Sequence, residues 1–305
     1  MRVFRKPRAL SRGDAIAIVA PSGPFDRESF DAGLALLAER YQPRFDPGLF
    51  SRDRYLAGDD PRRLDELLRA LRDPQIRGVF CARGGYGAMR LLPRLTAMMA
   101  DAGEREPAVI NKPLVGFSDI TALHAWVQNQ DVISFHGPVV TQIPRLPAAS
   151  RERMFSVLES ATTPPTALTA TTTYVGGVAE GRLVGGNFAM LTQLIGTPFL
   201  PPLDGAILLL EDVGERPYKL DRMWTHLELA GVFREVRGIA LGTFTACEEK
   251  DAQYTSAEVL RDLAQATGLP CAAGFPIGHG DENETVPLGA RVRLDADARR
   301  LEFLD

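Results

Sequence analysis

Short apolar runs alternate with amphipathic segments along the first half of the chain. The strand-like runs cover 15–20, 76–81 and 114–117. Continuous apolar runs of this length, closed by turn residues, are typical of buried parallel strands. Segments 30–40 and 61–71 lie between them and carry apolar residues at helical spacing. This alternation predicts an open α/β sheet with ligands bound at the carboxyl ends of its strands.

The second half has a different pattern, with several short strands and fewer helices. The strand-like segments cover 181–184, 205–210, 236–244 and 290–294, and the helical ones cover 187–195 and 220–230. The stretch 161–173 separates the two halves and is rich in Thr and Pro without strand or helix patterning. We therefore predict an N-terminal α/β domain over 1–160, a linker over 161–175 and a smaller α+β domain over 176–305.

Composition and charge narrow the class of protein. The 305 residues are 45% hydrophobic and 24% charged, with a net charge of -4 and no basic block, so nucleic acid is not an expected partner. The three cysteines are widely spaced and odd in number, which argues against a disulfide framework and a cysteine-based zinc site. No apolar stretch is long enough for a signal peptide or a bilayer span. We expect a cytoplasmic protein without a membrane partner.

Ser118 directly follows the apolar run 114–117 and precedes a helical pattern. A sharp strand-to-helix turn at such a place can lift a nucleophile above the sheet. The helix N-terminus would then direct free N–H groups at an oxyanion. Alternatively, Ser118 or Asp119 only caps the helix, which is the commoner role of a serine there.

A glycine-rich segment, Ala82-Arg-Gly-Gly-Tyr-Gly87, follows the second strand-like run. Adjacent glycines let the backbone approach a ligand and present N–H groups to negative charge, although a plain tight turn is an equal alternative. The spacing is not that of a dinucleotide-binding fingerprint. Cys81 precedes this segment inside an apolar strand, where a cysteine is usually inert.

An acid and a histidine follow other strand-like runs. Glu211 and Asp212 end the apolar run 205–210, and either could orient a histidine or pair with a nearby arginine, Arg216 or Arg222. His279 lies between two glycines in a loop, where it can act as a general base. Its acidic neighbours, Asp281, Glu282 and Glu284, raise the alternative of a metal site. A single His without metal-ligand spacing makes that set poor, so we expect no metal and activity that survives chelation.

Read in order, these segments resemble the serine LD-carboxypeptidase family (muramoyltetrapeptide carboxypeptidases), which also includes microcin C immunity hydrolases. The matching stretches begin with Ile18-Val-Ala-Pro-Ser-Gly23, Ala82-Arg-Gly-Gly-Tyr-Gly87, Val115-Gly-Phe-Ser-Asp-Ile-Thr-Ala-Leu-His124 and Phe135-His-Gly-Pro138. They continue with Gly181-Arg-Leu-Val-Gly-Gly-Asn187, Leu210-Glu-Asp-Val-Gly-Glu215, Tyr218-Lys-Leu-Asp-Arg222 and Gly274-Phe-Pro-Ile-Gly-His-Gly280. The likeness thus spans nearly the whole chain in collinear order.

The resemblance implies a role for each matching position. Ser118 corresponds to the nucleophile, Glu211 to the acid and His279 to the base of a catalytic triad. The oxyanion hole would combine the N–H of Asp119 with one from the Arg83-Gly84-Gly85 loop, with Gly85 as the favoured donor. Arg83 and Gly84 would contact the substrate.

The resemblance also implies a reaction and an assembly. The substrate is a small peptide, a murein tetrapeptide that loses its terminal D-alanine in cell-wall recycling, and no cofactor is needed. The family is usually homodimeric, with the active site between its domains. Two alternatives remain: hydrolysis of a microcin C-like peptidyl or aminoacyl nucleotide, and a catalytically silent peptide-binding protein. The segment 101–112 is longer and more polar than the family pattern, which puts the substrate range in doubt.

Overall fold

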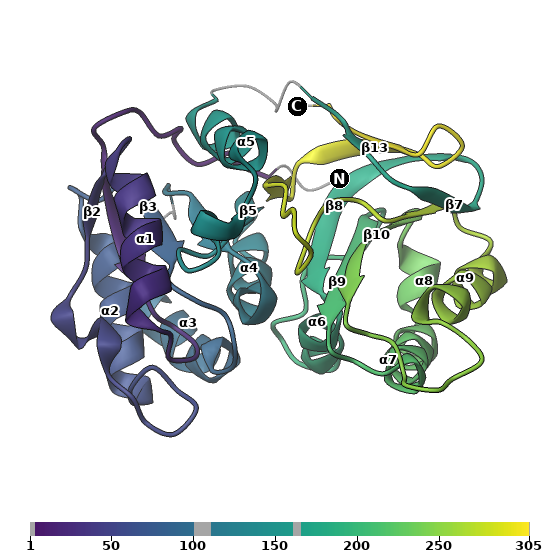
Figure 1. Cartoon of the computed structure of the whole chain (residues 1–305), viewed down its shortest axis with the longest axis horizontal. Coiled ribbons are helices and arrows are strands. Elements are labelled where there is room, and N and C mark those ends of the chain that lie inside the picture. Colours follow the sequence, from purple (N-terminus) through teal and green to yellow (C-terminus); the bar gives the residue numbers. More distant parts are fainter. Residues whose placement is uncertain (1–3, 101–110, 161–165, 305) are drawn as a thin grey trace.

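The computed structural model describes residues 4–100, 111–160 and 166–304, and its helices and strands form two lobes that lie side by side (Figure 1). Each lobe is built around one sheet, as the alternating pattern predicts, so the α/β fold class is confirmed. No helix within the described ranges combines the length and the apolar character that a membrane span needs.

The first lobe contains a six-stranded sheet in the order β12-β5-β4-β3-β1-β2. Its strands are β1 (Ala15–Val19), β2 (Gln42–Arg44), β3 (Gly78–Cys81), β4 (Leu114–Gly116), β5 (Ser134–His136) and β12 (Val286–Leu288). Strands β1 to β5 are parallel, whereas β12 runs antiparallel to β5. The helices are α1 (Arg27–Ala38), α2 (Asp60–Arg72), α3 (Leu92–Ala100), α4 (Thr121–Gln128) and α5 (Ala148–Glu159). Short 3₁₀ turns lie between them: η1 (Pro47–Phe50), η2 (Ala88–Leu91), η3 (Ser118–Ile120) and η4 (Ile143–Arg145).

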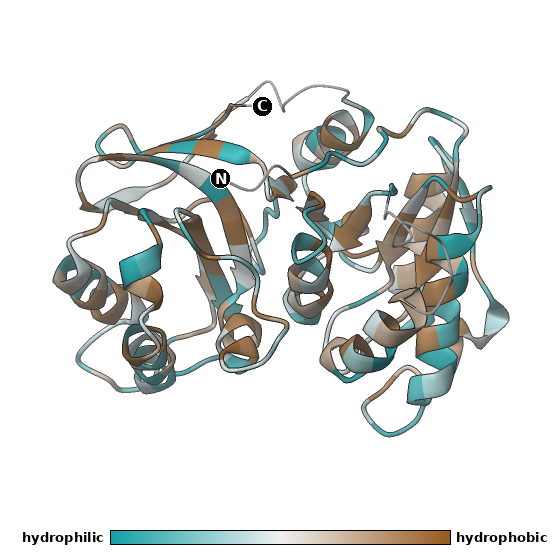
Figure 2. Ribbon diagram, turned by 180° about the vertical axis from the view of Figure 1, so that it is seen from behind, coloured by the Kyte–Doolittle hydropathy of each residue, from teal (hydrophilic) through white to brown (hydrophobic). Residues whose placement is uncertain are grey.

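Both faces of the first sheet are covered because its central strands, β1, β3 and β4, are buried at every position. Along β1, Ala17 and Val19 face the cluster that contains α2, α3 and α4, whereas Ile16 and Ile18 face the cluster that contains α1 and α5. This alternation follows from the two-residue period of a strand. Figure 2 shows the hydrophobic colour concentrated on the central strands and on the inner sides of the helices.

The second lobe contains an eight-stranded mixed sheet in the order β6-β14-β13-β8-β9-β10-β11-β7. Its strands are β6 (Leu168–Thr169), β7 (Thr172–Val175), β8 (Val178–Asn187), β9 (Ile207–Val213), β10 (Gly238–Thr245), β11 (Cys271–Ala273), β13 (Arg291–Asp295) and β14 (Arg300–Phe303). The helices are α6 (Phe188–Leu194), α7 (Pro217–Leu229), α8 (Val232–Glu235) and α9 (Ser256–Thr267). These helices cover one face of the sheet. On the other face, side chains of β8, β9 and β10 pack with Phe275, with β12 and with side chains of β13 and β14 from the same sheet.

The predicted linker over 161–175 is wrong in its second part. Leu168–Thr169 and Thr172–Val175 are strands of the second sheet, where β7 pairs antiparallel with β11. Threonine favours strands, and at a half-exposed sheet edge it needs no apolar alternation, so the pattern resembled a linker. Residues 161–165 lie outside the described residues, as does most of the unusual segment 101–112.

One segment of the predicted C-terminal domain belongs to the sheet of the first lobe. Strand β12 comes from the C-terminal part of the chain, yet it pairs with β5 of the first sheet through the registers Val286 to His136 and Leu288 to Ser134. Helix α6 adds a second contact, since Met190 and Leu194 belong to the same apolar cluster as α4. The two lobes are therefore joined by a strand pair and a shared core.

Candidate active site

The turn after β4 holds Ser118 in a conformation that serine rarely adopts. Its φ is 65°, in the left-handed region, and it begins the short η3 turn that leads into α4. Such a backbone costs about 1–3 kcal/mol for a residue other than glycine and persists only where its surroundings enforce it. The predicted sharp strand-to-helix turn is thus present, and Ser118 does not act as a conventional helix cap.

The glycine-rich loop packs directly against this serine. A Cβ added to Gly84 would lie 2.8 Å from the Ser118 Cβ and 3.0 Å from its Oγ, so only glycine fits there. Gly85 has a φ of 106°, which also favours glycine. The Gly84 carbonyl accepts a hydrogen bond from the Gly23 N–H at 3.0 Å, whereas the Gly84 and Gly85 N–H groups donate to no described residue. Two free donors therefore lie beside the serine.

Asp119 fixes the position of that loop through its side chain. Its Oδ2 accepts hydrogen bonds from Ser22 Oγ at 2.6 Å and from the Ala88 N–H at 2.8 Å, and the residue is 1% exposed. Burial raises the pKa of this carboxyl, and the hydrogen bonds from Ser22 and the backbone oppose the rise. The carboxylate thus ties the strand-end segments at Ser22 and Ala88 to the serine turn.

An acid and a base are paired in the second lobe. His279 Nδ1 lies 2.7 Å from Glu211 Oε2, and the histidine side chain is 17% exposed while that of Glu211 is fully buried. Glu211 lies on β9, in the middle of the second sheet, and His279 follows β11. A buried carboxylate on Nδ1 leaves Nε2 as the ring nitrogen available for proton transfer.

Glycine allows this pair to approach. Gly278 has a φ of 121°, and a Cβ there would lie 2.5 Å from Glu211 Oε2 and 2.8 Å from Thr243 Oγ1. Thr243 Oγ1 in turn accepts a hydrogen bond from the Gly280 N–H at 3.2 Å. Gly278 therefore allows close packing on the acid, and Gly280 allows close packing on Thr243.

The neighbouring acids have other partners. Asp212 accepts hydrogen bonds from Asn187 Nδ2 at 3.0 Å and from the Ala189 and Val213 N–H groups, so it holds the start of α6. Burial raises the pKa of Asp212 to about 6. Glu215 pairs with Lys219 at 3.0 Å. Of the three acids in this segment, Glu211 alone contacts the imidazole.

One cavity joins the serine and the histidine. Its volume is about 660 Å³, and it is lined by Pro24, Phe25, Asp26, Ser29, Arg52, Arg83, Gly84, Gly85, Phe117, Ser118, Val139, Thr141, Gln142, Arg145, Val213 and His279. The predicted residues Arg83, Gly84, Gly85, Ser118 and His279 all face it, whereas Glu211 and Asp119 lie behind its wall. The Phe117 ring packs on the His279 ring, with centroids 4.6 Å apart. Ser118 Oγ makes no hydrogen bond to a described residue.

The loop that carries His279 is tied to the first lobe directly after the histidine. Asn283 is fully buried; its Oδ1 accepts a hydrogen bond from the Gly278 N–H at 3.0 Å, and its Nδ2 donates to Gln142 Oε1 at 2.9 Å. Glu284 follows, and it accepts a hydrogen bond from Ser150 Oγ at 2.7 Å. The sequence analysis did not identify Asn283 or Gln142, because a single amide side chain has no spacing or neighbours that indicate a function. Asn283 lies in the glycine-rich stretch around His279, but nothing in the sequence distinguishes it there.

Of the remaining histidines, His124 and His136 are buried and His226 is exposed, and all three cysteines are buried. Burial lowers the pKa of His124 to about 4, and its Nε2 contacts the Gly116 carbonyl at 2.8 Å. Burial raises the pKa of the Cys81 thiol far above its usual range, which agrees with an inert core residue. Among residues 4–100, 111–160 and 166–304, no group of three or more His, Cys, Asp or Glu side chains is placed to hold a metal.

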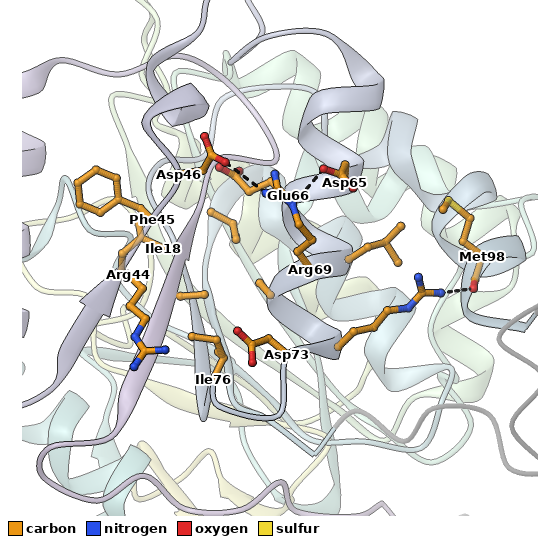
Figure 3. A pocket seen from close by; sticks show the side chains of 15 residues that line it. Ile18, Arg44, Phe45, Asp46, Asp65, Glu66, Arg69, Asp73, Ile76 and Met98 are labelled. Carbon is orange, nitrogen blue, oxygen red and sulfur yellow. Dashed lines mark hydrogen bonds and ion pairs between the residues drawn. The ribbon is translucent and has the colours of Figure 1, made fainter.

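A second cavity of about 630 Å³ lies beside α2, on the first lobe (Figure 3). Its arginines have partners within the protein. Arg69 contacts Asp46 at 3.3 Å and Asp65 at 3.0 Å. Arg44 donates a hydrogen bond to the Gln75 side chain, and Arg72 donates one to the Met98 carbonyl. The Glu66 carboxylate accepts hydrogen bonds from Arg62 and from the Ala20 N–H. None of the residues placed in catalysis by sequence lines this cavity, so the cavity at Ser118 is the candidate active site.

Comparison with known proteins places both halves of the chain in one family. Residues 16–137 match the LD-carboxypeptidase N-terminal domain, and residues 180–294 match the LD-carboxypeptidase C-terminal domain. The chain is 37% identical to a Synechocystis protein that is named as a carboxypeptidase, over 99% of this chain and 98% of that protein. It is 33% identical to the murein tetrapeptide carboxypeptidase of Pseudomonas aeruginosa, over 93% and 94% of the two chains.

Two further similarities bear on the fold and on the range of the family. The crystal structure of muramoyltetrapeptide carboxypeptidase from Oxalobacter formigenes superposes with a TM-score of 0.81 at 27% identity, covering 95% of this chain and 97% of that one. The microcin C7 self-immunity protein MccF of Escherichia coli is 26% identical over 97% and 94% of the chains. Because both halves match the two domains of one family in order, the chain belongs to the LD-carboxypeptidase family.

Proposed function

We propose that this protein is a serine LD-carboxypeptidase that releases terminal D-alanine from a murein tetrapeptide, with Ser118, His279 and Glu211 as its triad. The observation that carries the proposal is that His279, paired with the buried Glu211 at 2.7 Å, lines the same cavity as a serine held in a strained turn. The name of the P. aeruginosa relative supplies the substrate class.

In the proposed reaction, Ser118 Oγ attacks the carbonyl carbon of the amide bond that precedes D-alanine. The hydroxyl proton passes to His279 Nε2, and Glu211 stabilises the resulting imidazolium through Nδ1. His279 then gives the proton to the leaving amine as the C–N bond breaks. Water, deprotonated by the same imidazole, hydrolyses the acyl-enzyme and restores the serine. Nucleophile and base approach to about 2.6–3.2 Å in such complexes and are often farther apart without substrate.

The oxyanion of the tetrahedral intermediate would lie at the free N–H groups beside Ser118. Asp119 N lies in the η3 turn directly after Ser118, and Gly85 N donates to no described residue. A donor aimed at developing negative charge in a partly dry site is commonly worth about a hundred- to a thousandfold in rate. Asp119 would thus contribute its backbone to catalysis and its buried carboxylate to the shape of the loop.

The microcin-type alternative requires a surface on which a nucleobase can stack. Three aromatic side chains near the junction of the lobes are candidates for this role: Phe188, Phe199 and Trp224. Phe188 and Trp224 are buried in the core of the second lobe, and Phe199 packs against the apolar cluster that contains α4. The aromatic residues on the cavity wall are already packed, Phe25 on Phe30 and Phe117 on His279. These contacts favour the peptide substrate. The silent binding protein is disfavoured because such a protein has no use for a buried acid on the histidine.

The test is mass spectrometry of products from a murein tetrapeptide and a microcin analogue, incubated side by side with the purified protein. We expect a tripeptide and free D-alanine from the first substrate and slower or no cleavage of the second. Cleavage of the nucleotide conjugate alone would replace the proposal with the microcin activity. Binding of the peptide without any turnover would support the silent binding protein.

Three further expectations follow from the family resemblance. Activity should survive exhaustive chelation, with elemental analysis as the check on residual metal. Light scattering should give the mass of a homodimer. Fractionation of the source cells should place the protein in the cytoplasm.

A further inference from the structure

The wall of the active-site cavity is strongly cationic. Arg52, Arg83 and Arg145 line it, and the one acid among its lining residues is Asp26. Asp26 is engaged as the N-cap of α1, where its Oδ1 accepts a hydrogen bond from the Ser29 N–H at 2.7 Å. Its pKa is lowered first by that hydrogen bond and, least of the contributions, by the charge of Arg145.

These arginines differ from Arg69, which belongs to α2 and lines the second cavity. Arg69 contacts two aspartates, whereas Arg52 and Arg145 form no ion pair or hydrogen bond with a described residue. Arg83 uses one of its five N–H donors on the Pro24 carbonyl, which is neutral. Among the described residues, none of these three guanidinium groups has a carboxylate within ion-pair distance, and a ligand that carries a carboxylate would supply such a partner.

Of the three arginines, Arg83 is the one that is adjacent in sequence to a residue in contact with the nucleophile, Ser118. It directly precedes Gly84, whose backbone packs against the Ser118 side chain. In an amino acid leaving group, the carboxylate is separated from the scissile nitrogen by a single carbon atom. A carboxylate of that kind has to lie within a few ångströms of the serine, which is within reach of an arginine side chain on the neighbouring loop.

We propose that Arg83, flanked by Arg52 and Arg145, binds the terminal carboxylate of the substrate and so restricts the enzyme to the free C-terminus of a peptide. This inference rests on the proposed function and deepens it. It explains how a cavity that is open to solvent can select the last residue of a peptide: an internal amide bond places no carboxylate at the arginines and leaves three guanidinium groups unpaired.

The test compares a murein tetrapeptide with a free terminal carboxylate and the same peptide ending in D-alaninamide. The readout is the ratio of kcat/KM for acid over amide within each enzyme, which is independent of the fraction of correctly folded protein. The variants are Arg83→Gln, Arg52→Gln and Arg145→Gln. Arg54→Gln is the control, since Arg54 lies on the same loop as Arg52 but does not line the cavity.

We expect the wild-type protein to prefer the acid, and Arg83→Gln to lower that ratio about ten- to a hundredfold, the range for loss of a charge-assisted hydrogen bond. Arg83→Lys should restore part of the preference, and rising salt should weaken the wild-type preference. Arg52→Gln and Arg145→Gln should lower the ratio less, and Arg54→Gln should leave it unchanged. An unchanged ratio in Arg83→Gln, with turnover of the peptide by the wild type, would overturn the carboxylate site alone. Failure of the wild type to cleave either peptide would overturn the proposed function with it.

Discussion

The two lobes hold their parts of the candidate site by different means. The serine is placed by a short local connection, in which a strand, one strained residue and a helix follow one another within a few positions. The histidine is placed by long-range packing, since its loop contacts Glu211 and Thr243 in the second lobe and Gln142 in the first. The position of the nucleophile therefore depends on local backbone geometry, whereas the position of the base depends on the contacts that join the two lobes.

The largest expected effect is that of removing the nucleophile. Ser118→Ala keeps the strained backbone and the packing of Gly84, so the protein should fold with an unchanged melting temperature. Turnover of the tetrapeptide should fall at least about a thousandfold, as expected when the nucleophile of a triad is removed. Steady-state kinetics and a thermal melt measure both effects, and near wild-type turnover would refute the triad.

The second-largest effect is expected from Gly278→Ala, a substitution that disturbs the contact between Glu211 and His279. In Gly278→Ala the new Cβ would lie 2.5 Å from Glu211 Oε2, so the carboxylate or the loop has to move. We expect kcat to fall about a hundredfold, because misplacement by about one ångström can cost that much in rate. The kinetics should be followed together with a thermal melt.

Gly231→Ala is the matched control for this change. Gly231 has a φ of 82°, and no described atom lies within 4 Å of the position that a Cβ would take, so the substitution strains the backbone without a clash. It should lose stability and keep its kcat. Equal losses of kcat in the two variants would show that the close approach of Gly278 to Glu211 is irrelevant to catalysis.

A smaller effect is expected at the tie between the lobes. Asn283→Ala removes the hydrogen bonds to the Gly278 N–H and to Gln142, so the His279 loop should sample other positions. We expect kcat to fall about tenfold with little change in KM, because the substrate wall itself remains. Ser150→Ala, which loses only the contact with Glu284, is the control. A change confined to KM or to stability in Asn283→Ala would assign the residue a purely structural role.

The contrast between the lobes also explains what sequence reasoning could predict. Ser118 and the glycine-rich loop were identifiable because their signals are local, an apolar run followed by turn residues. The pairing of β12 with β5 and the bond between Asn283 and Gln142 join segments more than a hundred residues apart, and neither has a pattern of its own. The threonine-rich strand β7 has no strand pattern of its own, so its sequence resembles a linker; it is recognisable as a strand only by its pairing with β11, which lies far along the chain. His279 is a candidate base from its place between two glycines, but the choice of Glu211 over Asp212 as its acid rests on family resemblance, because both acids end the same apolar run.

The smallest effect is expected from the cysteines. Burial raises the pKa of Cys247 to about 11 and that of Cys271 to about 12, and Cys81 is fully buried as well. At neutral pH all three remain protonated and shielded, so alkylation of the native protein with iodoacetamide should leave turnover unchanged. Cys81→Ser should also remain active. Rapid inactivation that coincides with modification of Cys81 would revive a cysteine nucleophile.

The central claim is that a serine from the first lobe is activated by a histidine and an acid from the second. The most direct measurement is intact-mass analysis and peptide mapping after treatment with a fluorophosphonate, which reacts with activated serines. We expect a single adduct on Ser118, none in Ser118→Ala, and labelling slowed at least about a hundredfold in His279→Ala and in Glu211→Gln. An adduct on another residue, or equally fast labelling of Ser118 without His279, would contradict it.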